Sequence, residues 1–198
     1  IQDLRNSDSI QNYLNDTQIK SLPYVEQLEM RIPYQTIQQH ETYLKQILES
    51  IDPTAELTIA GSYRRKCKDS GDIDVLLKTP SVKTNRIYKQ FIQKLVNDGY
   101  IIESLSMGSK KFMGICQEKG GFAKRIDIMY TKPEEYPFAI LYFTGSKEFN
   151  TNMRSDLLSK GLSLNEYSLK DSSTKKPVEH LFETEQDIFD YINYEYVE

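Results

Sequence analysis

The sequence predicts a mixed α/β (α+β) fold, in which helices cover one face of a sheet and a smaller lobe follows after about Pro133. Five short strand-like segments fall between residues 57 and 130, with one long helical pattern among them. Strands with so few helices between them indicate a mixed sheet. The 198 residues are enough for one compact domain or two small lobes with a sizeable core.

The first expected elements precede the sheet. Polar residues dominate from Gln2 to Thr17, where short helices or turns are expected. Proline restricts the residue before it to extended geometry, so the triplet Arg31-Ile32-Pro33 marks a boundary. Apolar residues at a spacing of about 3.6 then predict an amphipathic helix over 34–51, which ends before Pro53.

The sheet and the smaller lobe come next. We expect strands over 57–60, 72–77, 100–105, 111–116 and 124–130, and a helix over 86–98 that closes at Gly99. Beyond Pro133 we expect helices over 137–141, 147–159 and 185–193, with polar turns near 170–174.

Composition excludes several classes of function. The two cysteines, Cys67 and Cys116, form no CxxC pair, which excludes a disulfide scaffold and a zinc ribbon and favours a reducing compartment. The two histidines, His40 and His180, lie far apart, which excludes Ser-His-Asp triads and His-rich zinc sites. Carboxylates remain as metal ligands, and they favour magnesium chemistry. Apolar runs span only a few residues, so no membrane-spanning helix is expected.

Charge is divided unevenly along the chain. The net charge is −4, which by itself argues against a nucleic-acid partner. Between Gly61 and Arg125, however, 14 basic residues stand against 6 acidic ones, a local charge of +8, while the remainder carries −12. A middle segment this basic can attract phosphates, although a solvated lysine-rich surface explains the same count.

Three aspartates are the candidate catalytic and metal-binding residues. Strand side chains alternate, so Asp72 and Asp74 point to one side of a strand while Ile73 points to the other. Asp127 repeats the pattern between two isoleucines. If the two strands are neighbours, all three carboxylates share one face, where a divalent cation relieves their repulsion. An isolated Asp-x-Asp is more often part of a solvated loop.

A Gly-Ser pair lies just ahead of the first of these strands. Gly61 and Ser62 offer a phosphate a backbone free of side-chain bulk, exposed N–H groups and a hydroxyl donor. Arg64, Arg65 and Gly71 lie close by in sequence. Taken alone, an ordinary turn glycine and a pair of surface arginines explain these residues as well.

The order of these motifs resembles a known family. Gly61-Ser62 followed by Asp72-x-Asp74 is similar to the signature of the nucleotidyltransferase superfamily. Further motifs resemble family X DNA polymerases, closest to the DNA polymerase beta type: KFMG at 111–114, LYFTGS at 141–146, FN at 149–150, NMR at 152–154, LNEY at 164–167 and DIFDYI at 187–192. The resemblance runs from about Leu4 to the end of the chain, and the ordered series is highly specific.

The resemblance implies a nucleotidyltransferase-type palm with a mixed sheet and helices, followed by a small α/β thumb lobe. Residues 1–30 correspond to a remnant of the fingers, 31–133 to the palm and 134–198 to the thumb. Family members usually carry an N-terminal lyase domain and helix-hairpin-helix elements, neither of which is visible in this sequence. A fragment of a longer protein and a reduced natural form both stay open.

By the same resemblance, the chain is expected to be a DNA-directed DNA polymerase that adds deoxynucleotides to a primer 3′-hydroxyl, with gap filling in DNA repair as its role. The implied cofactor is Mg²⁺, as two ions, for which Mn²⁺ can substitute. The implied partners are gapped or primer-template DNA and deoxynucleoside triphosphates. We expect a monomer that uses no membrane and works inside the cell, in the nucleus if its source is eukaryotic.

The resemblance also implies roles for single residues. Asp72 and Asp74 correspond to ligands of both magnesium ions, and Asp127 to a ligand of the ion near the primer terminus. The positions that contact the nucleotide correspond to Arg31, Ser62, Arg65, Gly71, Tyr142, Phe143, Gly145 and Asn150. Those that contact DNA correspond to Lys111, Arg125 and Arg154.

Two positions depart from the beta-type pattern. Lys147 stands where that type has an aspartate after the thumb Thr-Gly-Ser, which can alter stacking on the incoming base. Met129 stands where an arginine follows the third carboxylate, so an ion pair that competes for a catalytic aspartate in the family is absent.

Two alternative functions are kept at this point. One is a template-independent nucleotidyltransferase, and the other is a non-catalytic nucleic-acid-binding module with the same fold. The Tyr-Phe-Thr-Gly-Ser turn resembles the templated type and therefore favours it, because the pattern of terminal transferases has a Gly-Trp turn at this position. Intact Asp72, Asp74 and Asp127 argue against the non-catalytic module.

Overall fold

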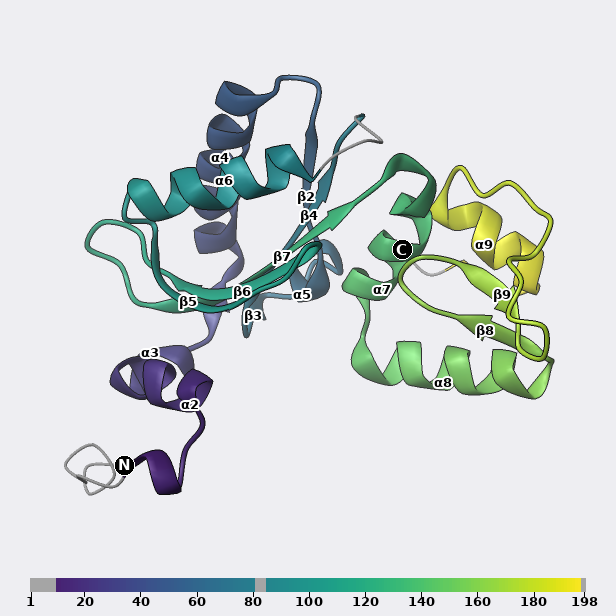
Figure 1. Cartoon of the computed structure of the whole chain (residues 1–198), viewed down its shortest axis with the longest axis horizontal. Coiled ribbons are helices and arrows are strands. Elements are labelled where there is room, and N and C mark those ends of the chain that lie inside the picture. The colour runs from purple at the N-terminus through teal and green to yellow at the C-terminus, as the bar shows by residue number, and fades with distance from the viewer. Residues whose placement is uncertain (1–9, 81–84, 197–198) are drawn as a thin grey trace.

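The computed structural model describes residues 10–80 and 85–196 (Figure 1). Its largest element is a five-stranded mixed sheet in the segment that the resemblance assigns to the palm. The strands, in order across the sheet, are β2 (Glu56–Ile59), β4 (Ile73–Lys78), β7 (Lys124–Thr131), β6 (Lys111–Cys116) and β5 (Ile101–Met107). β4 and β7 run parallel, and every other neighbouring pair is antiparallel.

Helices α4 (Tyr34–Ile51) and α6 (Arg86–Asn97) cover one face of this sheet (Figure 1). Both helices bury a side chain every three or four residues, as the apolar stripes predicted: Ile37, His40, Leu44 and Leu48 on α4, and Tyr88, Phe91, Ile92 and Leu95 on α6. The same apolar core contains alternate residues of the central strands: Ile73, Val75 and Leu77 of β4, and Ile126, Ile128 and Tyr130 of β7. This core fixes the register of β4 and β7.

The opposite face of the sheet has two different halves. Because side chains alternate along a strand, Asp74 and Leu76 of β4 and their register partners Asp127 and Met129 of β7 belong to this face. Leu76 and Met129 are buried in an apolar cluster with helix α7 (Tyr136–Thr144). The two aspartates lie outside that cluster and line a cavity. One half of the face is therefore covered by α7, and the other half faces the cavity, where a ligand can reach the aspartates.

The segment after residue 133, the thumb of the resemblance, lies to one side of the sheet and has a core of its own (Figure 1). After α7 come α8 (Lys147–Ser159), the strands β8 (Leu162–Leu164) and β9 (Leu169–Asp171), and α9 (Glu185–Ile192). The core is formed by Phe138, Leu141, Met153, Leu157, Leu164, Leu169, Phe182, Ile188, Phe189 and Ile192. Among the described residues, the thumb core therefore shares none with the core beneath the sheet, and of the thumb elements α7 alone packs apolar side chains on that sheet.

Several short elements complete the fold. Before the palm lie η1 (Ile10–Asn12), α2 (Asp16–Ser21), η2 (Leu22–Tyr24) and α3 (Val25–Leu28). The palm also contains β1 (Ile32–Pro33), which pairs with β3 (Asp69–Ser70), together with α5 (Gly61–Arg64) and η3 (Pro133–Glu135). The buried Lys124 ammonium donates to the carbonyls of Gln27 and Met30, at 3.4 and 3.1 Å. These bonds hold the end of α3 on the sheet.

The predicted fold class is confirmed, and each helix and strand predicted between residues 34 and 193 is present with small shifts at its ends. The short helices or turns expected from Gln2 to Thr17 lie partly outside the described residues. The strand expected over 72–77 begins at Ile73, so Asp72 comes immediately before it. The helix expected over 137–141 runs to Thr144, so Tyr142 and Phe143, which we expected in a turn, belong to α7. This helix is buried along nearly its whole length, so no alternation of polar and apolar residues marks its end.

Two short strand pairs were not predicted. The pairs β1–β3 and β8–β9 contain strands of two or three residues, which are too short to show a period-two pattern. Across the described ranges, no helix is both long enough and apolar enough to span a membrane.

Candidate active site

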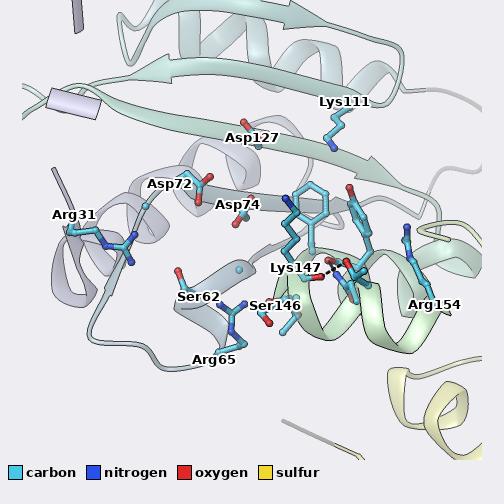
Figure 2. A pocket seen from close by; sticks show the side chains of 18 residues that line it. Arg31, Ser62, Arg65, Asp72, Asp74, Lys111, Asp127, Ser146, Lys147 and Arg154 are labelled. Carbon is cyan, nitrogen blue, oxygen red and sulfur yellow. Dashed lines mark hydrogen bonds between the residues drawn. The ribbon is translucent and has the colours of Figure 1, made fainter. Parts of the chain in front are cut away.

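A cavity of about 550 Å³ lies between the sheet and the thumb helices α7 and α8. Every predicted site residue except Arg125 lines it (Figure 2). The three aspartates lie on the side of the sheet, Ser62 belongs to α5 and Arg65 to its C-terminal end, and Lys147 and Arg154 come from α8 (Figure 2). A volume of this size is typical of pockets for small molecules.

Two aspartates are neighbours across the central strands. Asp74 of β4 and Asp127 of β7 are partners in the parallel register. Asp72 comes just before β4, two residues from Asp74, and lies on the same side (Figure 2). A slip of one residue in either strand would turn its buried apolar residues toward solvent, so the core also fixes the aspartates. The predicted grouping of three carboxylates on one face is present.

Crowding and burial raise the pKa of two of these carboxyls. Burial, and then the charges of Asp72 and Asp127, raises the pKa of Asp74 from 3.8 to about 7. Burial also raises the pKa of Asp127, although the guanidinium of Arg125 lowers it in part. Arg125 Nη2 lies 3.5 Å from Asp127 Oδ2 and 3.8 Å from Asp72 Oδ2, so Arg125 is a partial counter-ion. The remaining negative charge attracts a further cation.

The aspartates suit magnesium in their chemistry but do not converge on one point. In residues 10–80 and 85–196, no group of three or more His, Cys, Asp or Glu side chains is arranged to hold a metal ion. Asp127 Oδ1, however, is buried and has no hydrogen-bond partner within the described residues. A buried oxygen of this kind suits a metal ligand. Mg²⁺ uses one or two carboxylates and completes its shell with water and substrate phosphates, so these residues fit it.

Gly61 brings α5 against the aspartates. Its φ of +59° favours glycine, and a Cβ at this position would overlap Asp74 Oδ2. The start of α5 therefore lies directly beside Asp74. The next residue, Ser62, donates its hydroxyl to Ser70 Oγ at 2.7 Å and lines the cavity. The close approach of α5 to Asp74 therefore requires glycine at position 61, and it places the Ser62 hydroxyl in the cavity beside the carboxylates.

Arg31 is held at the edge of the cavity by the β1–β3 pair. Its Nε donates to Asp69 Oδ1 at 2.8 Å, and its Nη2 donates to the Asp69 carbonyl at 3.2 Å. Gly71 leaves space for this guanidinium, since an added Cβ would stand 3.0 Å from Arg31 Nη1. Arg31 and Gly71, which are far apart in sequence, therefore form one part of the site.

Two consecutive arginines bind the end of α7. Arg65 Nη1 donates to the Thr144 carbonyl, and Arg64 Nη1 donates to the Thr144 hydroxyl at 2.7 Å. Arg64 also forms an ion pair with the buried Glu185 of α9, at 2.8 Å between Nη2 and Oε2. Arg65 lines the cavity, whereas Arg64 lies in a separate groove between palm and thumb. Both arginines therefore contact the thumb, and only Arg65 also lines the cavity.

The thumb wall consists of the end of α7 and one face of α8. Asn150 Nδ2 donates to the Tyr142 carbonyl at 2.8 Å, which joins the two helices. Gly145, with a φ of +68°, makes the connection, and Ser146 Oγ accepts a hydrogen bond from the Phe149 N–H at the start of α8. The residues of α8 that face the cavity recur at helical spacing: Lys147, Asn150, Thr151 and Arg154.

Cations outnumber carboxylates in the described lining of the cavity. The cationic side chains are Arg31, Arg65, Lys111, Lys147 and Arg154, against three aspartates. The ring of Tyr142 lies near two of them: Arg154 is 5.0 Å and Lys111 is 5.6 Å from its centroid. The cavity therefore suits a ligand with several negative charges.

Some residues outside the predicted set also line the cavity: Gly61, Thr144, Ser146, Lys147 and Thr151. Most belong to quoted motifs or to the departures from them, so a sequence signal existed. Thr151 had none, because only the helical face of α8 places it there. His40 lies elsewhere, buried on α4 with Nδ1 2.7 Å from the Tyr100 hydroxyl, and burial lowers its pKa to about 4.

The chain matches two family models, the DNA polymerase beta palm over residues 31–133 and the DNA polymerase beta thumb over residues 139–198. Together the two models span most of the chain. The family is therefore established by the larger part of the sequence rather than by one motif.

Three curated relatives are similar over much of the chain. DNA polymerase lambda of Rattus norvegicus is 29% identical over 147 residues, which cover 70% of this chain and 26% of the relative. DNA polymerase lambda of Arabidopsis thaliana is 25% identical over 218 residues, covering 100% of this chain and 40% of the relative. DNA nucleotidylexotransferase of Xenopus laevis is 24% identical over 236 residues, covering 100% of this chain and 46% of the relative. The chain spans less than half the length of each of these relatives. On the two family models that it matches, the chain belongs to the DNA polymerase beta-like members of family X.

Proposed function

We propose that this chain is a DNA-directed DNA polymerase that transfers a deoxynucleotide from its triphosphate to a primer 3′-hydroxyl. The cavity carries the proposal, because aspartates on the face of the sheet oppose cations from α8 and from the palm. Such a site can bind a metal-bound polyanion beside a second reactant. Membership in the family supports a polymerase-type function.

Magnesium is the proposed cofactor, as two ions held by Asp72 and Asp74, with Asp127 as a further ligand of the ion near the primer. When bound, magnesium lowers the pKa of the attacking hydroxyl and compensates the charge of the leaving pyrophosphate. The pKa of Asp74 is about 7 without metal, so Asp74 releases a proton when it becomes a ligand. Metal affinity should therefore rise with pH. Mn²⁺ also accepts carboxylate ligands and can substitute.

The triphosphate is proposed to bind at the palm edge of the cavity. Arg31, Ser62 and Arg65 provide cationic and hydroxyl donors there, and Gly71 keeps the space open. Bonds from guanidinium groups to phosphate are among the stronger hydrogen bonds in proteins. Each of these side chains is already held by a neighbour in the fold, so little ordering is needed when a nucleotide binds.

The sugar and the base of the nucleotide are proposed to lie against the thumb wall. Tyr142 and Phe143 offer ring surface beside Gly145, and Asn150 offers a polar edge. Lys111, Arg125 and Arg154 are proposed to contact DNA, in keeping with the local charge of +8 between residues 61 and 125. We further propose that the chain acts as a monomer inside the cell, on gapped or primer-template DNA during repair.

A template-independent nucleotidyltransferase is the second candidate. The similarity to DNA nucleotidylexotransferase of Xenopus laevis across the whole chain favours it. The Tyr-Phe-Thr-Gly-Ser sequence at 142–146 favours the templated reaction, since it resembles the beta type. A non-catalytic module is the weakest candidate, because all three aspartates line the cavity together.

Primer extension tests the proposed reaction. The chain is incubated with a duplex that has a one-nucleotide gap, the complementary deoxynucleoside triphosphate and Mg²⁺, and the labelled primer is measured. We expect growth by one nucleotide that EDTA prevents and that Asp127→Asn loses. Asp16→Asn, an exposed change on α2, serves as the matched control. No extension by the parent chain with Mg²⁺ or Mn²⁺ would contradict the proposal and favour the non-catalytic module.

A further inference from the structure

Two consecutive lysines, Lys110 just before β6 and Lys111 at its start, reach the thumb. Lys111 Nζ lies 5.6 and 5.5 Å from the ring centroids of Tyr142 and Phe143 at the cavity. Lys110 takes the other direction and lies 4.5 Å from the ring centroid of Tyr167. The resemblance assigns a DNA contact to Lys111 but no role to Lys110.

Lys110 joins three parts of the chain. Its Nζ donates to both carboxylate oxygens of Glu135, at 3.0 and 2.8 Å. Glu135 is the last residue of η3 and comes immediately before α7, so it lies where the palm passes into the thumb. The Lys110 side chain is 31% exposed and that of Glu135 is 17% exposed, so water screens this contact less than a surface pair.

Tyr167 belongs to an ordered turn between β8 and β9. Asn165 Oδ1 accepts hydrogen bonds from the N–H groups of Tyr167 and Ser168, both at 2.9 Å. These bonds order the turn, so a contact that holds the Tyr167 ring also holds its neighbours Glu166 and Ser168. A contact at Tyr167 therefore positions the whole turn.

The same turn is connected to the wall of the cavity. Glu166 Oε2 lies 3.8 Å from Arg154 Nη2, and the Arg154 guanidinium lies over the ring of Tyr142 at 5.0 Å. Arg154 and Tyr142 both line the cavity. A continuous series of contacts therefore runs from Lys110 through the turn to the proposed nucleotide site.

We propose that Lys110 is a positioning residue that holds the β8–β9 turn on the palm and so sets Arg154 and Tyr142 for selection of the complementary nucleotide. This inference rests on the proposed polymerase function. Lys110 comes immediately before β6 and reaches both Glu135 and the ring of Tyr167.

The test is a set of matched variants of the full chain, assayed for single-nucleotide insertion into a gapped duplex. Lys110→Met keeps most of the side-chain length but removes the charge, and Tyr167→Leu removes the ring while leaving the pair with Glu135. Lys110→Arg and Tyr167→Phe keep the contact and should restore the parent values. Lys119→Met, an exposed change in the β6–β7 loop, controls for the loss of one positive charge.

We expect Lys110→Met and Tyr167→Leu each to weaken the apparent affinity for the complementary nucleotide about 3-fold to 10-fold, the range of a half-buried cation–π contact. Preference over mismatched nucleotides should fall by a similar factor, while DNA affinity matches that of Lys119→Met. The double variant should lose no more than Lys110→Met alone, because both changes remove the contact between Lys110 and Tyr167.

Losses that multiply in the double variant would overturn the proposal, as would a Lys110→Met variant that matches Lys119→Met in nucleotide affinity. If Lys110→Met fails to fold, Tyr167→Leu against Tyr167→Phe gives the same comparison from the thumb side. A parent chain that inserts no nucleotide would overturn the proposed function and this inference together. An active parent with unaffected variants would overturn this inference alone.

Discussion

The two walls of the cavity are built in different ways. On the palm wall, Asp74 and Asp127 belong to adjacent strands of one sheet, whose backbone ladder and shared core fix their separation. On the thumb wall, Tyr142 and Arg154 belong to a lobe with a core of its own. That lobe meets the palm through α7 and through a few polar contacts from Arg64, Arg65 and Lys110.

This difference separates two tasks. Groups that hold metals must keep fixed distances, and a sheet provides them because its strands cannot slip without exposing the core. Groups that select a nucleotide must respond to what is bound, and α8 belongs to a core that shares no described residue with the core beneath the sheet. We therefore expect changes in the palm wall to affect chemistry, and changes in the thumb wall to affect selection.

The largest expected effect is on the palm wall. Asp127→Asn should lower the rate of nucleotide transfer at least about 10³-fold, or roughly 4 kcal/mol of transition-state stabilisation, because it removes a proposed metal ligand. Binding of the triphosphate should stay mostly intact, since Asp72 and Asp74 remain. Single-turnover insertion and nucleotide titration measure the two quantities separately. A rate within tenfold of the parent would mean that Asp127 does not hold a metal.

The charge on Asp74 gives the next effect, on stability without metal. The unfolded chain loses this proton near pH 3.8, whereas the folded chain keeps it to about pH 7, so stability falls as pH rises between these values. Asp74→Asn removes the penalty and should stabilise the protein by roughly 2–4 kcal/mol at pH 8, with the gain vanishing toward pH 4. Urea unfolding in EDTA at several pH values measures this. A gain that is the same at every pH would contradict the assigned pKa.

The ion pair between the walls gives a smaller effect on stability. Arg64→Met should destabilise the docked thumb by about 2 kcal/mol, because the Glu185 carboxylate then stays buried without its cation. The double variant with Glu185→Gln should regain part of the loss. Urea unfolding of the two variants at pH 7 measures the difference, with Lys160→Met, an exposed change at the C-cap of α8, as control. If the double variant is the less stable of the two, Arg64 acts through packing rather than charge.

The smallest predicted effect is on selection. Arg154→Ala should lower the preference for a complementary nucleotide about tenfold and change DNA binding less, because Arg154 contacts the Tyr142 wall and no proposed metal ligand. Insertion of matched and mismatched nucleotides by the variant, compared with Lys160→Ala, measures the preference. Equal losses for both kinds of nucleotide would make Arg154 a plain structural residue and would weaken the division between the walls.

Sequence patterns were sufficient for the parts of the fold that are periodic. The helix at 34–51 and the central strands carry apolar residues at regular spacing. The grouping of Asp72, Asp74 and Asp127 followed from strand alternation together with the assumption that the two strands are neighbours. Residues of the thumb wall were found only through the resemblance, because α7 is buried at nearly every position and its sequence shows no polar face.

Contacts between segments that are far apart in the chain could not be predicted from the sequence. Arg64 and Arg65 are adjacent and chemically equal, yet one binds Glu185 and the other faces the cavity. Only the placement of α5 between palm and thumb decides this. Likewise, nothing in the sequence around Lys110 indicates a contact with Tyr167. The strands on either side of Tyr167 have only three residues each, which is too short to show a periodic pattern.

Template-directed synthesis by this chain is the central claim, and the rate of insertion of each of the four nucleotides opposite each template base tests it most directly. The substrate is a duplex with a one-nucleotide gap, and the same primer without a template base serves as the second arm. The account predicts that the complementary nucleotide is inserted at least about 10²-fold faster than the others, with little insertion when the template base is absent. Equal insertion of all four nucleotides, with or without a template base, would contradict it and would make the chain a template-independent transferase.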